Sequence, residues 1–180
     1  MNLPELTLCV DAWIIQDGNY GEFHRGDSLT CAIEFYGELR ASAQRRAAIT
    51  HLKENLYRVC AQVVFSAPHA WAIDFGLGAF QECPPPAGAA NGAWFEGELE
   101  LAIDPFFYRE YLYKAPGMPD LFNTWQIGAV ARNDTPWVKA PNGNVYVRDV
   151  ARSQWTPVEH TDAWHDDDGR SAYLLQLRRA

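Results

Sequence analysis

Hydrophobic and polar residues alternate with a period of two along several separate stretches of this chain. The pattern is clearest in residues 57–65, and residues 71–77 repeat it after the turn-forming sequence Ser-Ala-Pro-His. Successive side chains of a strand point to opposite faces, so this period is typical of a strand with one buried face. The stretch therefore predicts a β-hairpin that needs further strands to cover it.

The same alternation predicts more strands along the rest of the chain. They fall in residues 6–16, 28–36, 93–103, 125–132, 154–165 and 171–178. Turn-forming residues separate most of these stretches, and no internal repeat occurs. Strands joined by turns instead of regular helices favour an antiparallel sandwich or barrel.

Two Asx-Gly pairs predict tight hairpins near the C-terminus. Asn142-Gly143 fits a two-residue type I′ turn. The register that follows sets Ala140 opposite Val145 and Val138 opposite Val147 on one face, with Lys139 opposite Tyr146 and Trp137 opposite Arg148 on the other. Asp168-Gly169 predicts a second hairpin, with Trp164 beside Tyr173.

One segment, residues 39–56, has a helical pattern instead. It is rich in Ala, Gln, Arg, Leu, Lys and Glu, and Ser42 could cap its start. Ala48, Leu52 and Leu56 form an apolar stripe at i, i+4 and i+8. We therefore expect one amphipathic helix that lies against the sheet.

These elements predict a single all-β domain over residues 1–180, mainly antiparallel. We expect a barrel or sandwich of about nine or ten strands with one peripheral helix inside residues 39–56. A chain of 180 residues is long enough to bury a core without a metal or disulfides. The four cysteines are far apart, without metal-ligand spacing, and are expected to be free thiols.

The charge balance limits the classes of partner. The chain has 15 Lys and Arg against 23 Asp and Glu, a formal net charge of -8. Nucleic-acid binding depends on clustered basic residues, so we expect no nucleic-acid partner and a basic protein partner instead. The N-terminal apolar run is interrupted by Glu5 and Asp11. We expect neither a signal peptide nor a membrane span, and a cytoplasmic location.

Catalytic and metal-binding motifs are absent from the sequence, so no cofactor is expected. His160 and Asp162 share one face of a predicted strand and are weak candidates for metal ligands, but an acidic solvated hairpin explains them better. Glu96 and Glu98 share one strand face and could act as the paired carboxylates of a hydrolase. That chemistry requires a cleft and unequal pKa values.

Aromatic residues on polar strand faces are the best candidates for a binding site. Trp13, Trp94 and Trp137 each occupy the more polar face of a predicted strand, and Tyr146 and Arg148 share the face of Trp137. The leading hypothesis is a non-enzymatic binding module with an acidic, aromatic-bearing sheet face for a protein partner. A β-barrel that binds a small ligand or carbohydrate is one alternative, and the hydrolase is another. The oligomeric state stays open.

Overall fold

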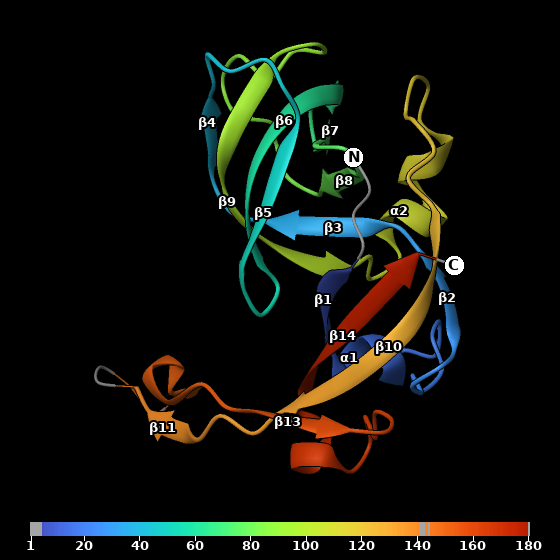
Figure 1. The fold of residues 1–180 in the computed structure, drawn as a ribbon, viewed down its shortest axis with the longest axis vertical. Helices are drawn as coiled ribbons and strands as arrows, with labels where there is room; N and C mark the ends of the chain where they lie inside the picture. Colours follow the sequence, from blue (N-terminus) through green and yellow to red (C-terminus); the bar gives the residue numbers. More distant parts are fainter. Residues whose placement is uncertain (1–4, 141–142, 144, 180) are drawn as a thin grey trace.

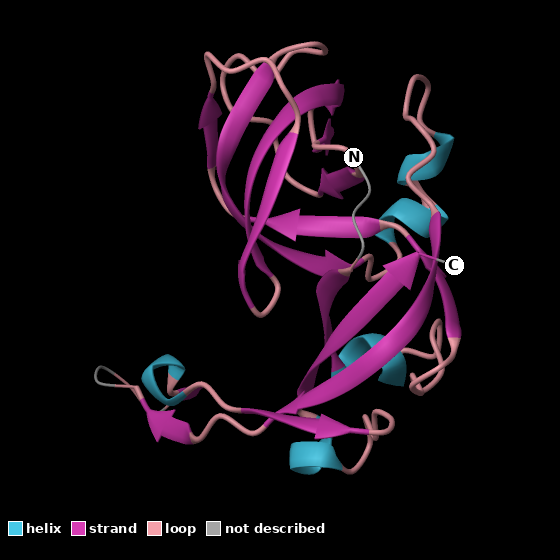
Figure 2. Cartoon of the chain, viewed as in Figure 1, coloured by secondary structure: helices cyan, strands magenta, loops and turns pink. Residues whose placement is uncertain are grey.

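Five strands close into a barrel. The computed structural model of the chain describes residues 5–140, 143 and 145–179, and it consists mainly of strands with a few short helical segments (Figures 1 and 2). Around the barrel the order is β9-β3-β8-β7-β6, and pairing between β6 and β9 completes the circle. The barrel strands are β3 (Ile33–Tyr36), β6 (Leu56–Ala67), β7 (Ala70–Asp74), β8 (Gly78–Gln81) and β9 (Trp94–Ile103). The predicted all-β fold is confirmed.

The sheet continues beyond the barrel through β1. This strand pairs in parallel with β9 and in antiparallel with β14, and the order then runs to β10 and β13. The added strands are β1 (Leu6–Asp11), β2 (Ser28–Cys31), β10 (Asn123–Asn133), β13 (Trp155–Val158) and β14 (Ala172–Arg179). Two further strands extend the barrel itself, β4 (Leu39–Ala41) on β9 and β5 (Ala48–Lys53) on β6.

Short helical segments fill the connections between strands. They are α1 (Ala12–Gln16), α2 (Phe107–Glu110) and the 3-10 segments η1 (Leu112–Lys114), η2 (Val150–Arg152) and η3 (Asp166–Gly169). One hydrophobic core runs from the barrel into the β1–β14–β10 extension. A second cluster, which includes Tyr108 of α2 and Leu112 of η1, covers Ala72 and Phe80 on the outer side of β7 and β8. Both faces of these two strands are therefore buried.

The hairpin predicted around residue 68 is present as β6 and β7, with Ala67 opposite Ala70. Its register shifts between Val63 and Phe65. A bulge of this kind turns the following side chain to the other face of the sheet. Phe65 therefore packs in the outer cluster instead of the barrel core, where the uninterrupted alternation predicted it.

The helix predicted inside residues 39–56 is wrong. The segment forms β4, a loop and β5, and Ala48 pairs with Cys60 across the β5–β6 ladder. None of Ala48, Leu52 and Leu56 is a buried core residue, so the predicted apolar stripe does not pack into the core. Pairing with the edges of β6 and β9 satisfies the backbone of this segment and outweighs its helix-favouring composition.

Three strand predictions near the chain ends also need correction. The first strand ends at Asp11, and Trp13 lies in α1, where the adjacent Ile14 and Ile15 are both buried. The second is broken at Ala32, where the chain changes partner from β10 to β9. The hairpin at Asp168-Gly169 does not form, because β14 pairs with β1 and β10 instead.

Trp164 and Tyr173 consequently do not form a cross-strand pair. Trp164 is exposed, whereas Tyr173 is completely buried and donates a hydrogen bond to Asp166 at 2.9 Å. Long-range pairing of β14 within the sheet buries far more apolar surface than a local hairpin would. The packing of β14 in the whole sheet therefore outweighs the local turn preference of Asp168-Gly169.

Candidate binding site

The hairpin that carries three of the predicted binding residues has the predicted register. β11 (Trp137–Lys139) pairs with β12 (Tyr146–Arg148), and Trp137 lies opposite Arg148. The guanidinium carbon of Arg148 lies 4.2 Å from the centroid of the Trp137 ring, as expected for a cation–π pair. Ala140 donates to the carbonyl of Val145 at 2.9 Å. The turn residues Pro141, Asn142 and Asn144 lie outside the described residues.

We call residues 134–154, which contain this hairpin and η2, the arm. Its base is closed by the backbone bond from Asp134 to Gln154, 2.9 Å long. In Figure 1 the arm lies on the side of the molecule toward which the β5–β6 turn points. The hydroxyl of Ser153 donates to Glu54 in that turn at 2.8 Å, which ties the arm to the barrel.

Asp167 in η3 fixes the aromatic face of the arm. One oxygen of its carboxylate accepts from Arg148 at 2.6 Å and from the indole of Trp137 at 2.9 Å. Asp167 has φ 50 and Asp168 has φ 53, a left-handed conformation that is unfavourable for residues other than glycine. The contacts with Trp137 and Arg148 offset this backbone strain.

A cleft of about 370 Å³ lies between the arm and the sheet. One wall comes from β1, β9, the start of β14 and the β5–β6 turn, and the other comes from the arm, the residues on either side of it and Arg170. The cleft is lined by Cys9, Asp11, Glu54, Asn55, Glu100, Asn133, Thr135, Trp137, Arg148, Val150, Ser153, Trp155, Arg170 and Ala172. We call it the acidic cleft, because the first wall carries Asp11, Glu54 and Glu100.

The three carboxylates all raise the pKa of one thiol in the cleft, that of Cys9. The pKa of the Cys9 thiol is raised, first by burial and then by the negative charges of Asp11, Glu100 and Glu54. Asp11 itself is exposed at the rim of the cleft, yet the neighbouring walls remove enough water to raise the pKa of its carboxyl. The nearby indole of Trp13 acts in the opposite direction and lowers the pKa of Asp11. Trp13 therefore lies beside the cleft.

Four of the five predicted binding residues thus gather around the acidic cleft. Trp137 and Arg148 line it, Trp13 contacts Asp11, and Tyr146 lies with Trp137 along an adjoining pocket. Trp94 does not belong to this group. It begins β9, six residues or about 20 Å along the strand from the cleft residue Glu100.

No feature of the sequence identified the carboxylates of the cleft. Glu54 lay inside the segment predicted as a helix, and the β5–β6 turn places it beside the arm. Asp11 and Glu100 lie on neighbouring strands only because β1 pairs with β9 in parallel. Only a topology that joins strands 90 residues apart in the chain brings these groups together.

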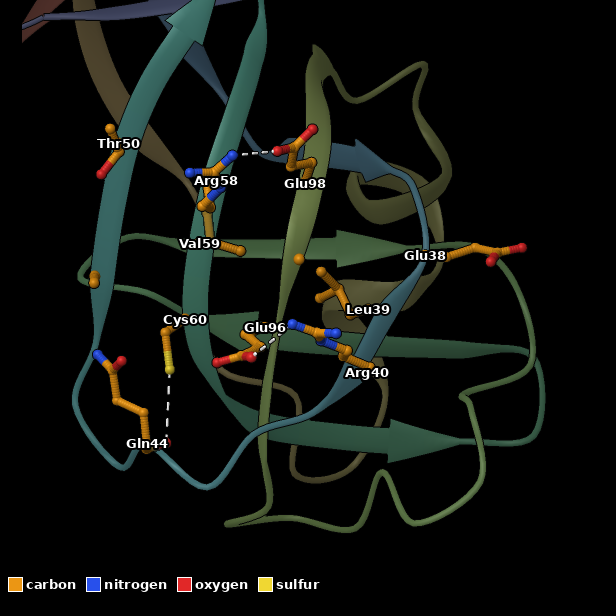
Figure 3. Close-up of a pocket in the computed structure, with 12 residues that line it drawn as sticks. Glu38, Leu39, Arg40, Gln44, Thr50, Arg58, Val59, Cys60, Glu96 and Glu98 are labelled. Atoms are coloured by element: carbon orange, nitrogen blue, oxygen red, sulfur yellow. Dashed lines mark hydrogen bonds and ion pairs between the residues drawn. The ribbon is translucent and has the colours of Figure 1, made fainter.

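The carboxylates of the hydrolase alternative line a different and larger groove, of about 750 Å³, on the outer face of β4, β9, β6 and β5 (Figure 3). Each has its own basic partner. Arg40 lies 3.3 Å from Glu96 and Arg58 lies 2.6 Å from Glu98. Both arginines are largely exposed, so these are surface ion pairs of small net energy.

The electrostatics of this groove do not favour acid–base catalysis. A hydrogen bond from the Ser42 hydroxyl, together with Arg40, lowers the pKa of Glu96. A glycosidase needs one carboxyl with a raised pKa to act as the acid. The lining residues also include no aromatic side chain on which a sugar ring could stack.

The weak metal candidates point to different neighbours. Asp162 lies 2.7 Å from His165, and the ring of His160 stacks on His24 with centroids 5.3 Å apart. Among the described residues no group of three or more potential ligands is placed to hold a metal ion.

The burial of one carboxyl, that of Glu34, was not predicted from the sequence. Glu34 on β3 is only 5% exposed and accepts a hydrogen bond from Tyr36 at 2.6 Å. Burial raises its pKa to about 7, and the charges of Asp104 and Glu82 add to the effect. No motif marks this position, which lies between β8 and β9 in the sheet.

Comparisons with known proteins give no relative for this chain. No family model, curated protein or solved structure matches it. Within residues 5–140, 143 and 145–179, no helix is long and apolar enough to cross a membrane.

Proposed function

We propose that this protein is a non-enzymatic binding module that takes a cationic side chain of a basic protein partner into the acidic cleft. The observation that carries the proposal is the convergence of Asp11, Glu54 and Glu100 opposite the indole of Trp137 in one cleft. Carboxylates attract a guanidinium or ammonium group, and three of them in one cleft attract it more strongly than a single one.

The charges of the cleft leave its acidic wall available to a ligand. Arg148, on the opposite wall, is already matched by Asp167 at 2.6 Å. Among the residues that the structure describes, the carboxylate of Glu54 accepts a hydrogen bond from Ser153, whose hydroxyl brings no charge. The formal net charge of -8 would also speed the approach of a basic partner at low ionic strength.

The chemistry of the cleft supports binding over catalysis. Its one thiol, Cys9, has a raised pKa, so it stays protonated at neutral pH and is a poor nucleophile. No histidine is among the lining residues to act as a base for it.

Calorimetric titration with short capped peptides tests the proposal. The probes are acetyl-Gly-Arg-Gly-amide, its lysine analogue and the neutral analogue in which citrulline replaces arginine. We expect binding of the two cationic peptides only. The Glu54→Gln/Glu100→Gln double variant should bind them about tenfold more weakly, since partly exposed charge pairs each contribute roughly 0.5–1 kcal/mol.

Glu110→Gln is the control for each of the two substitutions made singly, because it removes one negative charge from an exposed position on α2. It should leave the affinity unchanged. Equal binding of the arginine and citrulline peptides, or equal weakening by Glu110→Gln, would contradict recognition at the cleft.

The size of the cleft also favours a second candidate, a small organic cation as the ligand. About 370 Å³ falls in the lower range of small-molecule pockets. N-acetylarginine amide separates the two functions: affinity equal to that of a longer basic peptide indicates a small ligand, whereas a gain with peptide length indicates a protein partner.

A further inference from the structure

We infer that the ligand of the acidic cleft also carries a carboxylate, and that it is the free C-terminal arginine or lysine of a partner chain, with Arg170 as the residue that binds the carboxylate. This inference rests on the proposed function and names the segment of the partner that enters the site. Its structural basis is the state of Arg170, which differs from that of the other arginines around the arm.

Three arginines around the arm are held by short contacts with carboxylates. Arg132 lies 2.8 Å from Asp134 and 2.7 Å from Asp166. Arg148 lies 2.6 Å from Asp167, and Arg152 lies 2.6 Å from Asp149. Their guanidinium groups are therefore committed to the fold. These ion pairs leave Arg132, Arg148 and Arg152 little capacity for a ligand.

Arg170 is held loosely. Its guanidinium lies 3.5 Å from Asp168, whose side chain is 92% exposed, and its Nε donates to the carbonyl of Asp167 at 3.4 Å. The Arg170 side chain is itself 63% exposed. Contacts of this length to exposed partners contribute little, so a ligand could replace them at small cost.

Arg170 lies between two pockets that could hold the cation and the carboxylate of one ligand. It lines the acidic cleft, and with Trp137 and Tyr146 it lines an adjoining pocket of about 470 Å³. Its guanidinium carbon lies 5.7 Å from the centroid of the Trp137 ring. A planar guanidinium can bind both oxygens of a carboxylate, so a ligand with its cation on the acidic wall can place a carboxylate on Arg170.

A second donor supports a ligand with an acceptor group. Trp155 is a lining residue of the cleft, and its indole N–H is buried without a hydrogen-bond partner among the described residues. An unsatisfied buried donor is destabilising, and an acceptor that reaches it would relieve the cost.

The bridge across the cleft favours a chain end. Ser153 and Glu54 line opposite walls and are joined by a bond of 2.8 Å. A polypeptide running through the cleft would have to pass this bridge, whereas a C-terminal residue can enter from one side. An arginine or lysine at a C-terminus carries the cation and the carboxylate on one residue.

Calorimetric titration with three peptides tests the inference. They are acetyl-Gly-Ser-Gly-Arg with a free carboxylate, the same peptide as its amide, and the amide acetyl-Gly-Ser-Arg-Asp with an internal acidic side chain. Wild-type protein should bind the free acid about tenfold more tightly than the amide. Arg170→Gln should abolish that difference and leave the affinity for the amide unchanged.

Arg25→Gln is the matched control. The Arg25 side chain is likewise 63% exposed and lies 3.8 Å from Glu159. It should preserve the tenfold preference for the free acid.

Three results would overturn the inference, and they separate it from the proposed function. Equal affinity for the free acid and the amide, or a preference for the acid that remains in Arg170→Gln, excludes Arg170 as the carboxylate contact. The cation site of the proposed function is still supported in that case if Glu54→Gln/Glu100→Gln weakens the binding of both peptides. Tighter binding of the Arg-Asp amide than of the free acid assigns the carboxylate to a side chain and excludes the chain end. Absence of binding by all three peptides refutes the proposed function and the inference together.

Discussion

Replacing Glu34 with glutamine should stabilise the protein at alkaline pH and leave its stability nearly unchanged at acidic pH. Glu34 is buried on β3, and its pKa is raised from the ordinary value of 4.5 to about 7. Between these two pH values the folded chain binds more protons at Glu34 than the unfolded chain does. Stability due to this group is therefore highest below pH 4.5 and falls as the pH rises toward 7.

The size of the effect follows from the same two values. One pKa unit corresponds to about 1.4 kcal/mol, so a rise from 4.5 to about 7 sets an upper limit of about 3 kcal/mol on the penalty of ionising Glu34. Glutamine is a neutral analogue of the protonated acid and has no such penalty. Below pH 4.5 the two proteins should therefore differ little, whereas above pH 7 Glu34→Gln should be the more stable by up to about 3 kcal/mol.

Urea denaturation at pH 4.5, 6 and 8 measures the difference directly. Glu38→Gln, an exposed acid on the loop after β3, serves as the control for a change in net charge. A difference between Glu34→Gln and wild type that does not change with pH, or that equals the difference for Glu38→Gln, would refute the reasoning from burial.

Three further substitutions test particular contacts. Gly97→Ala should destabilise the fold by about 1–3 kcal/mol in urea denaturation, because its Cβ would lie 2.8 Å from a carbonyl oxygen of the chain leading into β4. Gly21→Ala is the control and should be close to neutral, because no atom lies within 4 Å of its Cβ. Ser153→Ala removes the bond to Glu54 and should increase amide hydrogen exchange in the arm without a change in the barrel, and unchanged exchange would contradict the bridge. Asp104→Ala should lower the free energy of unfolding by about 2–3 kcal/mol, because the carboxylate accepts three backbone N–H groups at the start of α2; a loss below 0.5 kcal/mol would argue against that role.

The parts of the fold that could be predicted from the sequence are those in which local pattern and turn chemistry agree. The β11–β12 register followed from one Asn-Gly turn, and it placed Trp137 against Arg148 as the structure does. The β6–β7 hairpin followed from alternation and from the turn-forming residues between its halves, apart from the bulge that turns Phe65 outward. These features depend on residues that are neighbours in the chain.

The incorrect or missing predictions share one cause, because pairing between distant strands determines the structure of those segments. Residues 39–56 have a helix-favouring composition, but the edges of β6 and β9 accept them as strands. The acidic cleft could not be predicted either, since β1, β9, the β5–β6 turn and the arm each contribute a part of it. Trp137 and Arg148 could be identified from their local pairing, whereas Glu54, Glu100 and Arg170 have no local signature.

Chemical-shift mapping tests the central claim, recognition of a cation in the acidic cleft, most directly. Acetyl-Gly-Arg-Gly-amide is titrated into ¹⁵N-labelled protein, with the citrulline peptide as the reference. We predict saturable shifts of the Trp137 indole N–H and of the backbone amides of Asp11 and Glu100, with no shifts from citrulline. Shifts confined to Cys60 and Glu96 in the larger groove, or equal shifts with both peptides, would contradict the claim.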